Sequence, residues 1–136
     1  MFEILEHTAD IGFRARGSTA AELFENAALA MCSIACDLNR VAPRCEYPLA
    51  ASGEDYESLL VNWLSEILYW TDGRRIALCE FHVHQIAPDR VSGVARGEPY
   101  DPSRHAARAI VKAVTYHQLK VAEEPGGWVA EVFLDV

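Results

Sequence analysis

Basic residues are scarce in this sequence. It contains 12 Lys and Arg against 20 Asp and Glu, which gives a formal net charge of −8. Lys and Arg provide most of the protein contacts to nucleic-acid phosphates, so a uniformly acidic chain is a poor candidate for binding RNA or DNA by itself. A cation or a basic protein partner suits this charge better.

Several other absences exclude further classes. No apolar run approaches the roughly 20 residues needed to cross a bilayer, and the first residues lack the basic and apolar regions of a signal peptide. We therefore expect a cytoplasmic protein without membrane association. Phosphate-loop, Gly-x-Ser-x-Gly and His-Glu-x-x-His motifs are also missing. An autonomous enzyme is weakly supported.

The four cysteines do not occur as Cys-x-x-Cys pairs. Paired short spacings are the usual sign of a tetrahedral zinc site, and their absence favours free thiols that pack as small apolar residues in a reducing compartment. A chain of 136 residues that is 51% hydrophobic and 24% charged is long enough for one domain with its own core. We expect a single domain over residues 1–136.

Residue periodicity predicts an α+β fold. A first helix begins at Thr19, with Glu22 at the spacing of a capping box, and a second begins at Ser52 or Glu54 and ends at Asp72-Gly73. Alternating apolar and polar residues predict strands over 2–5, 11–16, 45–51, 78–86, 90–97, 109–121 and 128–136. We expect two helices packed on one face of a largely antiparallel β-sheet.

The apolar run Trp128 to Val136 predicts that the carboxyl end is held in a strand. The terminal carboxylate of Val136 would then lie beside Asp135, and a neighbouring strand would bring in Asp10. Oxygen ligands suit hard cations such as Ca²⁺, Mg²⁺ or Mn²⁺. The alternative is that Asp10 is an ordinary turn residue and Asp135 a solvated strand end.

A second candidate is the loop with Glu98, Asp101 and His105, which Pro99 and Pro102 restrict. Loops between rigid strands often carry function, and a preformed surface of this kind fits partner binding. The alternative is a plain polar connection in which Arg104 or Arg108 neutralises the local carboxylates.

A third candidate is the segment Lys112-Ala113-Val114-Thr115-Tyr116-His117. In a regular strand Lys112 and His117 lie on opposite faces, which weakens an acid–base scheme that uses both. The alternative is a sheet strand whose amphipathic side chains pack along the surface.

Taken together, these segments resemble the archease family. The matching stretches are His7-Thr8-Ala9-Asp10-Ile11-Gly12, residues 21–28 and 59–69, Gly97-Glu98 through Asp101 to His105, Lys112 to His117, and Trp128 to Val136. They occur in family order and cover nearly the whole chain. The combination of the HTAD and KAVTYH motifs in one short acidic chain is specific.

The resemblance implies an accessory protein rather than an enzyme. Archeases assist the RtcB-type RNA ligase in tRNA splicing: they promote guanylylation of a ligase histidine, restore multiple turnover and broaden the nucleoside triphosphates accepted. The resemblance thus implies that the protein contacts tRNA only indirectly, through the ligase. We expect the protein to be a monomer or weak oligomer. The family's divalent-metal site matches Asp10 and Asp135, with Val136 adjoining. Residues proposed to contact the partner are His7, Glu98, Asp101, His105, Lys112 and His117.

One position departs from the family pattern. Family members often have an acidic residue two positions before the lysine of KAVTYH, where this chain has Ile110. Any role of that carboxylate in the family cannot be assigned to Ile110. A metal site that uses this carboxylate as a ligand would need a different ligand in this chain.

Two other functions stay open. One is a metal-dependent phosphoester hydrolase that uses His7, Asp10 and Asp135. The other is an RNA-binding or chaperone module for a tRNA-modifying enzyme, which the net charge of −8 disfavours in its RNA-binding form.

Overall fold

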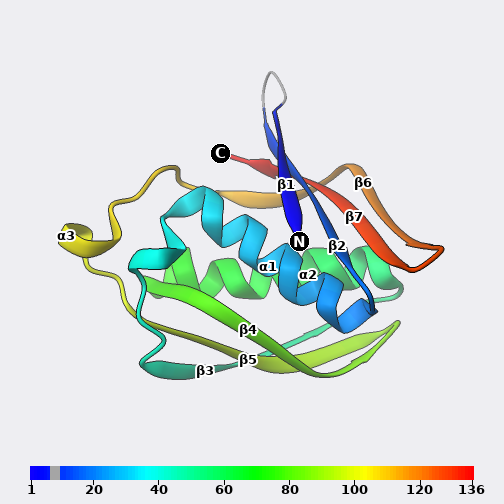
Figure 1. Ribbon diagram of the computed structural model, residues 1–136, viewed down its shortest axis with the longest axis horizontal. Coiled ribbons are helices and arrows are strands. Elements are labelled where there is room, and N and C mark those ends of the chain that lie inside the picture. The colour runs from blue at the N-terminus through cyan, green and yellow to red at the C-terminus, as the bar shows by residue number, and fades with distance from the viewer. Residues whose placement is uncertain (7–9) are drawn as a thin grey trace.

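Two antiparallel sheets enclose two helices in this computed structural model, which describes residues 1–6 and 10–136 (Figure 1). Four of the described strands form one sheet in the order β1 (Phe2–Glu6), β2 (Ile11–Gly17), β7 (Gly127–Asp135) and β6 (Ala113–Glu124). Three form the second sheet in the order β3 (Cys45–Ser52), β5 (Arg90–Pro99) and β4 (Ile76–Ala87). The α+β class and the antiparallel pairing are confirmed. The division into two sheets is a feature that the sequence patterns did not reveal.

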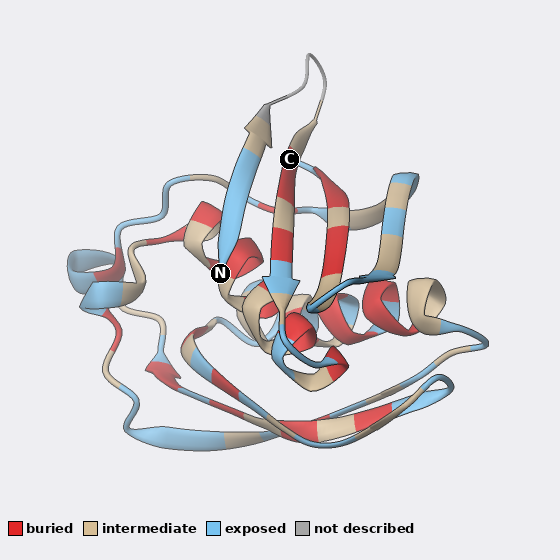
Figure 2. Cartoon of the chain, turned by 45° about the vertical axis from the view of Figure 1, so that its right-hand side comes forward, coloured by how far each residue is buried: buried red, intermediate tan, exposed pale blue. Residues whose placement is uncertain are grey.

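The core lies around helices α1 (Ala20–Ala35) and α2 (Tyr56–Leu68). Their apolar faces are shielded from solvent together with the inner faces of the strands (Figure 2). Trp63 of α2 is fully buried, and its indole N–H donates to the backbone carbonyl of Phe24 in α1 at 3.1 Å. This bond satisfies a polar group that would otherwise be costly to bury.

Local side-chain bonds define the helix starts. The Thr19 hydroxyl accepts from the backbone N–H of Glu22 at 3.1 Å, as expected for the cap of α1. The cap of α2 was predicted at Ser52 or Glu54, and this is wrong: Asp55 accepts from the N–H of Ser58 at 2.8 Å. After α2 the chain continues as a wider π-type turn, η2 (Tyr69–Gly73), so the predicted end at Asp72-Gly73 holds for the combined element.

The segment after β5 differs from the predicted loop and strand. Glu98 belongs to β5, and a short helix α3 (Pro102–His105) follows. Residues 106–112 are irregular, so β6 begins at Ala113 and not at Ala109. We call residues 106–112 the strap. Among the described residues no helix is both long and apolar enough to cross a membrane.

Strands β6 and β7 are interrupted by a large bulge. Thr115 pairs with Phe133 and Lys120 with Glu131, so residues 116–119 lie opposite the single residue 132. Gln118 has a positive φ of 52°, a conformation that non-glycine residues adopt rarely. The regular alternation that placed His117 and Lys112 on opposite faces therefore does not continue past Thr115.

Candidate metal site at an acidic tip

The pairing of β2 with β7 brings the start of β2 and the carboxyl end of the chain together. Ile11 pairs with Leu134 in this antiparallel register, so Asp10 and Asp135 are the next residues beyond it. In Figure 1 the C terminus lies beside the ends of β1 and β2. The predicted position of the terminal strand is confirmed. We call Asp10, Asp135 and the terminal carboxylate of Val136 the acidic tip.

Strand alternation places both aspartates on the sheet face that points away from the helices. Phe13 and Leu134 are fully buried toward the helices, and Asp10 and Asp135 lie at positions of the opposite parity. Asp135 is exposed, Asp10 is half-buried, and the terminal Val136 is 36% exposed. Neighbouring carboxylates with access to solvent are suited to binding a hard cation.

Two residues of the KAVTYH motif lie next to the acidic tip. The backbone N–H of Lys112 donates to the carbonyl of Asp135 at 2.8 Å, which fixes the strap to the end of β7. The β6 bulge brings the His117 ring to 6.3 Å from the Phe133 ring, edge to face. Phe133 in turn covers Gly12, where an added Cβ would stand 2.6 Å from the phenyl ring.

The carboxylates of the acidic tip are suitable ligands for a hard cation, but they are too few to complete its coordination shell. Carboxylate oxygens are the ligands that Ca²⁺, Mg²⁺ and Mn²⁺ prefer. Among the described residues, however, no three or more His, Cys, Asp and Glu side chains are grouped to hold a metal. The terminal carboxylate supplies a further oxygen group, and water or a partner would have to complete the shell. His7, another predicted contact residue, lies outside the described residues.

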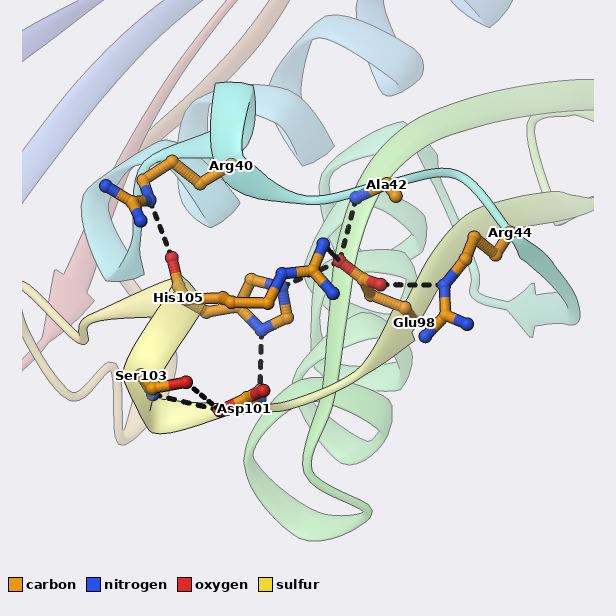
Figure 3. Close-up of polar contacts among 8 residues, drawn as sticks. Arg40, Ala42, Arg44, Glu98, Asp101, Ser103 and His105 are labelled. Carbon is orange, nitrogen blue, oxygen red and sulfur yellow. Dashed lines mark hydrogen bonds and ion pairs between the residues drawn. The ribbon is translucent and has the colours of Figure 1, made fainter.

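A second polar cluster surrounds Glu98 at the α3 side of the molecule (Figure 3). Both carboxylate oxygens of this fully buried residue are occupied. One accepts from Arg44 at 2.8 Å; the other accepts from the Ala42 N–H at 2.9 Å, Arg104 at 2.9 Å and the His105 ring at 2.8 Å. We call these five residues the Glu98 network.

The protonation states in the Glu98 network follow from its bonds. The N–H of Ala42, then the His105 ring, Arg44 and Arg104 lower the pKa of the Glu98 carboxyl to about 2, although burial opposes this. His105 Nδ1 accepts from the backbone N–H of Asp101 at 2.9 Å, so Nε2 carries the proton that binds Glu98. The ring is therefore neutral in this arrangement, and it holds α3 against β5.

The burial of Glu98 and His105 corrects the prediction that both residues contact a partner. Glu98 and His105 are 0% and 1% exposed, so neither side chain is available for direct contact with a partner. The Asp101 side chain accepts from Ser103 and begins α3. The alternative role for Arg104 is confirmed, because it neutralises Glu98. No sequence pattern pointed to Arg44 and Ala42, which lie more than 50 residues before Glu98 in the chain.

The cysteines are free thiols within the described residues. Cys32 and Cys36 are buried, as expected for small apolar residues, whereas Cys45 is exposed. Burial raises the pKa of the Cys32 thiol far above its usual range, and the pKa of Cys79 to about 11. Thiols held in the protonated form are poor nucleophiles and poor zinc ligands.

The fold and the acidic tip define a class of protein: a small α+β domain with two helices between antiparallel sheets, and with carboxylates where the start of β2 lies beside the end of β7. The model of the Archease protein family (MTH1598/TM1083) matches residues 2–136. The chain belongs to the archease family.

Individual relatives agree with this assignment. The chain is 42% identical to "Protein archease" of Methanosarcina mazei over 99% of this chain and 95% of the relative. It is 42% identical to "Protein archease" of Methanopyrus kandleri over 99% of both chains. The solution structure of Methanobacterium thermoautotrophicum protein 1598 superposes with a TM-score of 0.81 at 35% identity, covering 99% of this chain and 98% of that chain.

Proposed function

We propose that this protein activates an RtcB-type tRNA-splicing RNA ligase by promoting its guanylylation and multiple turnover, and by broadening its use of nucleoside triphosphates. Membership of the archease family supports an accessory role in tRNA processing. The observation that carries the proposal is the β2–β7 register, which leads to Asp10 and Asp135 at one end of one sheet.

The acidic tip is proposed to act as a divalent-metal site at the partner's nucleotide pocket. A cation held there would supply charge neutralisation to nucleotide phosphates, which is the main requirement of nucleotidyl transfer. Asp10 and Asp135 hold the ion and present it from an exposed strand end. The Lys112–Asp135 backbone bond fixes the direction of that strand end, and fixed geometry is what positioning of this kind needs.

The decisive experiment measures guanylylation of purified ligase with GTP and Mn²⁺, in the presence of the wild-type protein or Asp135→Ala. We expect the variant to lose about tenfold or more of the stimulation, because loss of even an outer-shell partner of a metal ligand typically weakens a site by about that factor. Asp89→Ala removes one carboxylate from the β4–β5 turn and should stimulate like the wild type. Equal rates with Asp135→Ala would refute the proposal.

The same preparation distinguishes the two other functions. Phosphoester turnover by the isolated protein, lost in Asp10→Asn, would support a hydrolase. Salt-sensitive binding of tRNA in the absence of ligase would support an RNA-binding module.

A further inference from the structure

A cavity of about 210 Å³ lies beneath the strap, and Asp10, Asp135 and Val136 of the acidic tip are not among its lining residues. It is enclosed by the last turns of α1, the η2 turn, the start of β4 and the strap itself. Its wall is mainly aliphatic or thiol-bearing, with Met31, Cys32, Ile76, Leu78, Ile110 and Val111 among the lining residues. We call it the strap cavity.

The strap cavity has room for one large side chain. An engineered aliphatic cavity of about 150 Å³ stays dry and binds benzene, so this volume accepts the side chain of Leu, Met or Phe. Ile110 lines the cavity and is nevertheless 65% exposed. A large apolar side chain beside an apolar cavity is typical of a binding site rather than of a closed core.

The surroundings of the strap cavity are rich in arginine. The three segments 37–44, 70–75 and 98–108 contain six of the chain's 12 basic residues but only four of its 20 acidic ones. One of those four, Glu98, is buried and already bound by Arg44 and Arg104. Residues of these segments or next to them line the cavity, where Arg75 and Asp72 are the charged lining residues. The excess of arginine in the adjoining segments favours a partner with negative charge.

Arg75 is held at the cavity by specific contacts, and Arg108 lies between the lining residues Ala107 and Ala109. The Arg75 guanidinium lies 4.9 Å above the Tyr100 ring, and the Arg75 carbonyl accepts from the Tyr100 N–H at 2.8 Å. Both residues line the cavity. The Arg108 N–H donates to the Ala35 carbonyl at 2.8 Å, and its guanidinium is 3.7 Å from Asp37. Positioned guanidinium groups are suited to carboxylates.

We propose that the strap cavity binds an acidic segment of a partner protein, with one large apolar side chain inserted and carboxylates on either side of it contacting Arg75 and Arg108. An apolar anchor in a pocket with a charged rim is the usual arrangement of an interaction hot spot. This docking surface goes beyond the proposed function, because it does not involve the acidic tip.

A nucleobase fits the strap cavity less well than a large apolar side chain does. Its polar edges need hydrogen-bond partners, and burying them without partners is costly. The polar side chains among the lining residues are those of Thr71, Asp72, Arg75 and Tyr100, which are exposed or half-exposed. The Tyr100 ring already carries a guanidinium on its face, which removes the aromatic surface on which bases usually stack.

The test is a titration of methyl-labelled protein with synthetic peptides, followed by NMR. Each peptide has Leu, Met or Phe at its centre and two Asp or Glu on each side. Matched peptides carry Ser at the centre or Lys at the flanks, and a uridine oligonucleotide serves as the RNA probe. We expect saturable shifts of the Ile76, Ile110 and Met31 methyls with at least one apolar-centred acidic peptide, binding about tenfold or more tighter than its matched peptides.

Two pairs of variants test whether the peptide binds at the strap cavity. Ala107→Trp fills the cavity from the strap, and Ala50→Trp adds the same side chain on exposed β3. Arg75→Glu reverses a charge at the cavity, and Arg90→Glu does so at the β4–β5 turn. We expect Ala107→Trp and Arg75→Glu to weaken peptide binding about tenfold or more, and the two controls to bind like the wild type with unchanged melting temperatures.

Three results would overturn the proposal. The first is that no apolar-centred acidic peptide binds tighter than its Ser or Lys counterpart. The second is that Ala107→Trp, still folded by its NMR spectrum, binds the peptide as the wild type does. The third is that the oligonucleotide shifts the same methyls at lower concentration. None of these measurements uses the ligase, so they stand apart from the guanylylation assay.

Discussion

Glu98 connects three parts of the chain through one carboxylate. Its donors come from Ala42 and Arg44 before β3 and from Arg104 and His105 in α3. A buried anion with complete hydrogen bonding is tolerated, whereas removal of its charge leaves two guanidinium groups and a backbone N–H poorly paired. The stability of the α3 side of the molecule therefore depends on this residue.

Glu98→Gln tests this dependence. We expect the melting temperature to fall by roughly 5–10 °C, because the amide keeps the shape of the side chain but loses the charge and places an N–H group among donors. Glu46→Gln is the matched control, since Glu46 binds Arg96 on the exposed surface. Similar melting temperatures for both variants would show that the Glu98 network contributes little.

The same carboxylate predicts a pH dependence. The pKa of Glu98 is lowered from 4.5 to about 2 in the folded protein, so its contribution is complete above pH 4.5 and is lost as the pH falls toward 2. The stability difference between wild type and Glu98→Gln should shrink over that window. Urea unfolding of both proteins at steps from pH 7 to pH 2 measures it, and a constant difference would contradict the assignment.

At the level of single residues, the two ends of the chain were easier to interpret than its middle. The apolar run to Val136 and the alternation of residues 11–16 predicted the two strands whose pairing leads to Asp10 and Asp135, whereas a joint site of the two aspartates was favoured only by the resemblance to the archease family. Pro99 and Pro102 follow Glu98 closely, and this pattern predicts an exposed loop. Its burial depends on Arg44 and Arg104, which meet only after the chain has folded.

Among the elements, α1 offers the clearest test of a local stabilising bond. Thr19→Ala removes the acceptor of the Glu22 N–H and should cost about 1 kcal/mol of unfolding free energy. Thr19→Ser keeps the hydroxyl and should stay close to the wild type. Chemical denaturation of the three proteins gives the values. Equal losses in Ala and Ser variants would indicate that side-chain packing and not the cap is responsible.

Helices and strands with a strong hydrophobic periodicity were predicted well, but the division of the strands into two sheets was not. The i, i+4 spacing of apolar residues located both helices, since each buries one face in the core. Alternation shows that a segment is a strand but not which strand lies beside it, so the two separate sheets stayed hidden. The run Ala109-Ile110-Val111 resembles a strand, yet it forms one wall of the strap cavity.

On the scale of the whole molecule, a cation at the acidic tip would join β2 to β7 and stabilise the fold. At a metal concentration 100 times Kd, the free energy of unfolding should rise by about 2.7 kcal/mol. Denaturation with Ca²⁺ or Mn²⁺, compared with chelator, measures this rise. Asp10→Asn should abolish it, whereas Asp89→Asn should retain it. Identical curves with metal and chelator for the wild type would contradict a resident metal site.

The bulge between β6 and β7 has a consequence for solubility. β6 is the outer strand of its sheet, and a long regular outer strand is a template on which other chains add strands and aggregate. Residues 116–119 of β6 lie opposite the single residue 132, and Gln118 has a left-handed backbone conformation. This bulge interrupts the row of outward N–H and C=O groups of β6. The irregularity that brings His117 over Phe133 thus also protects this edge from intermolecular strand addition.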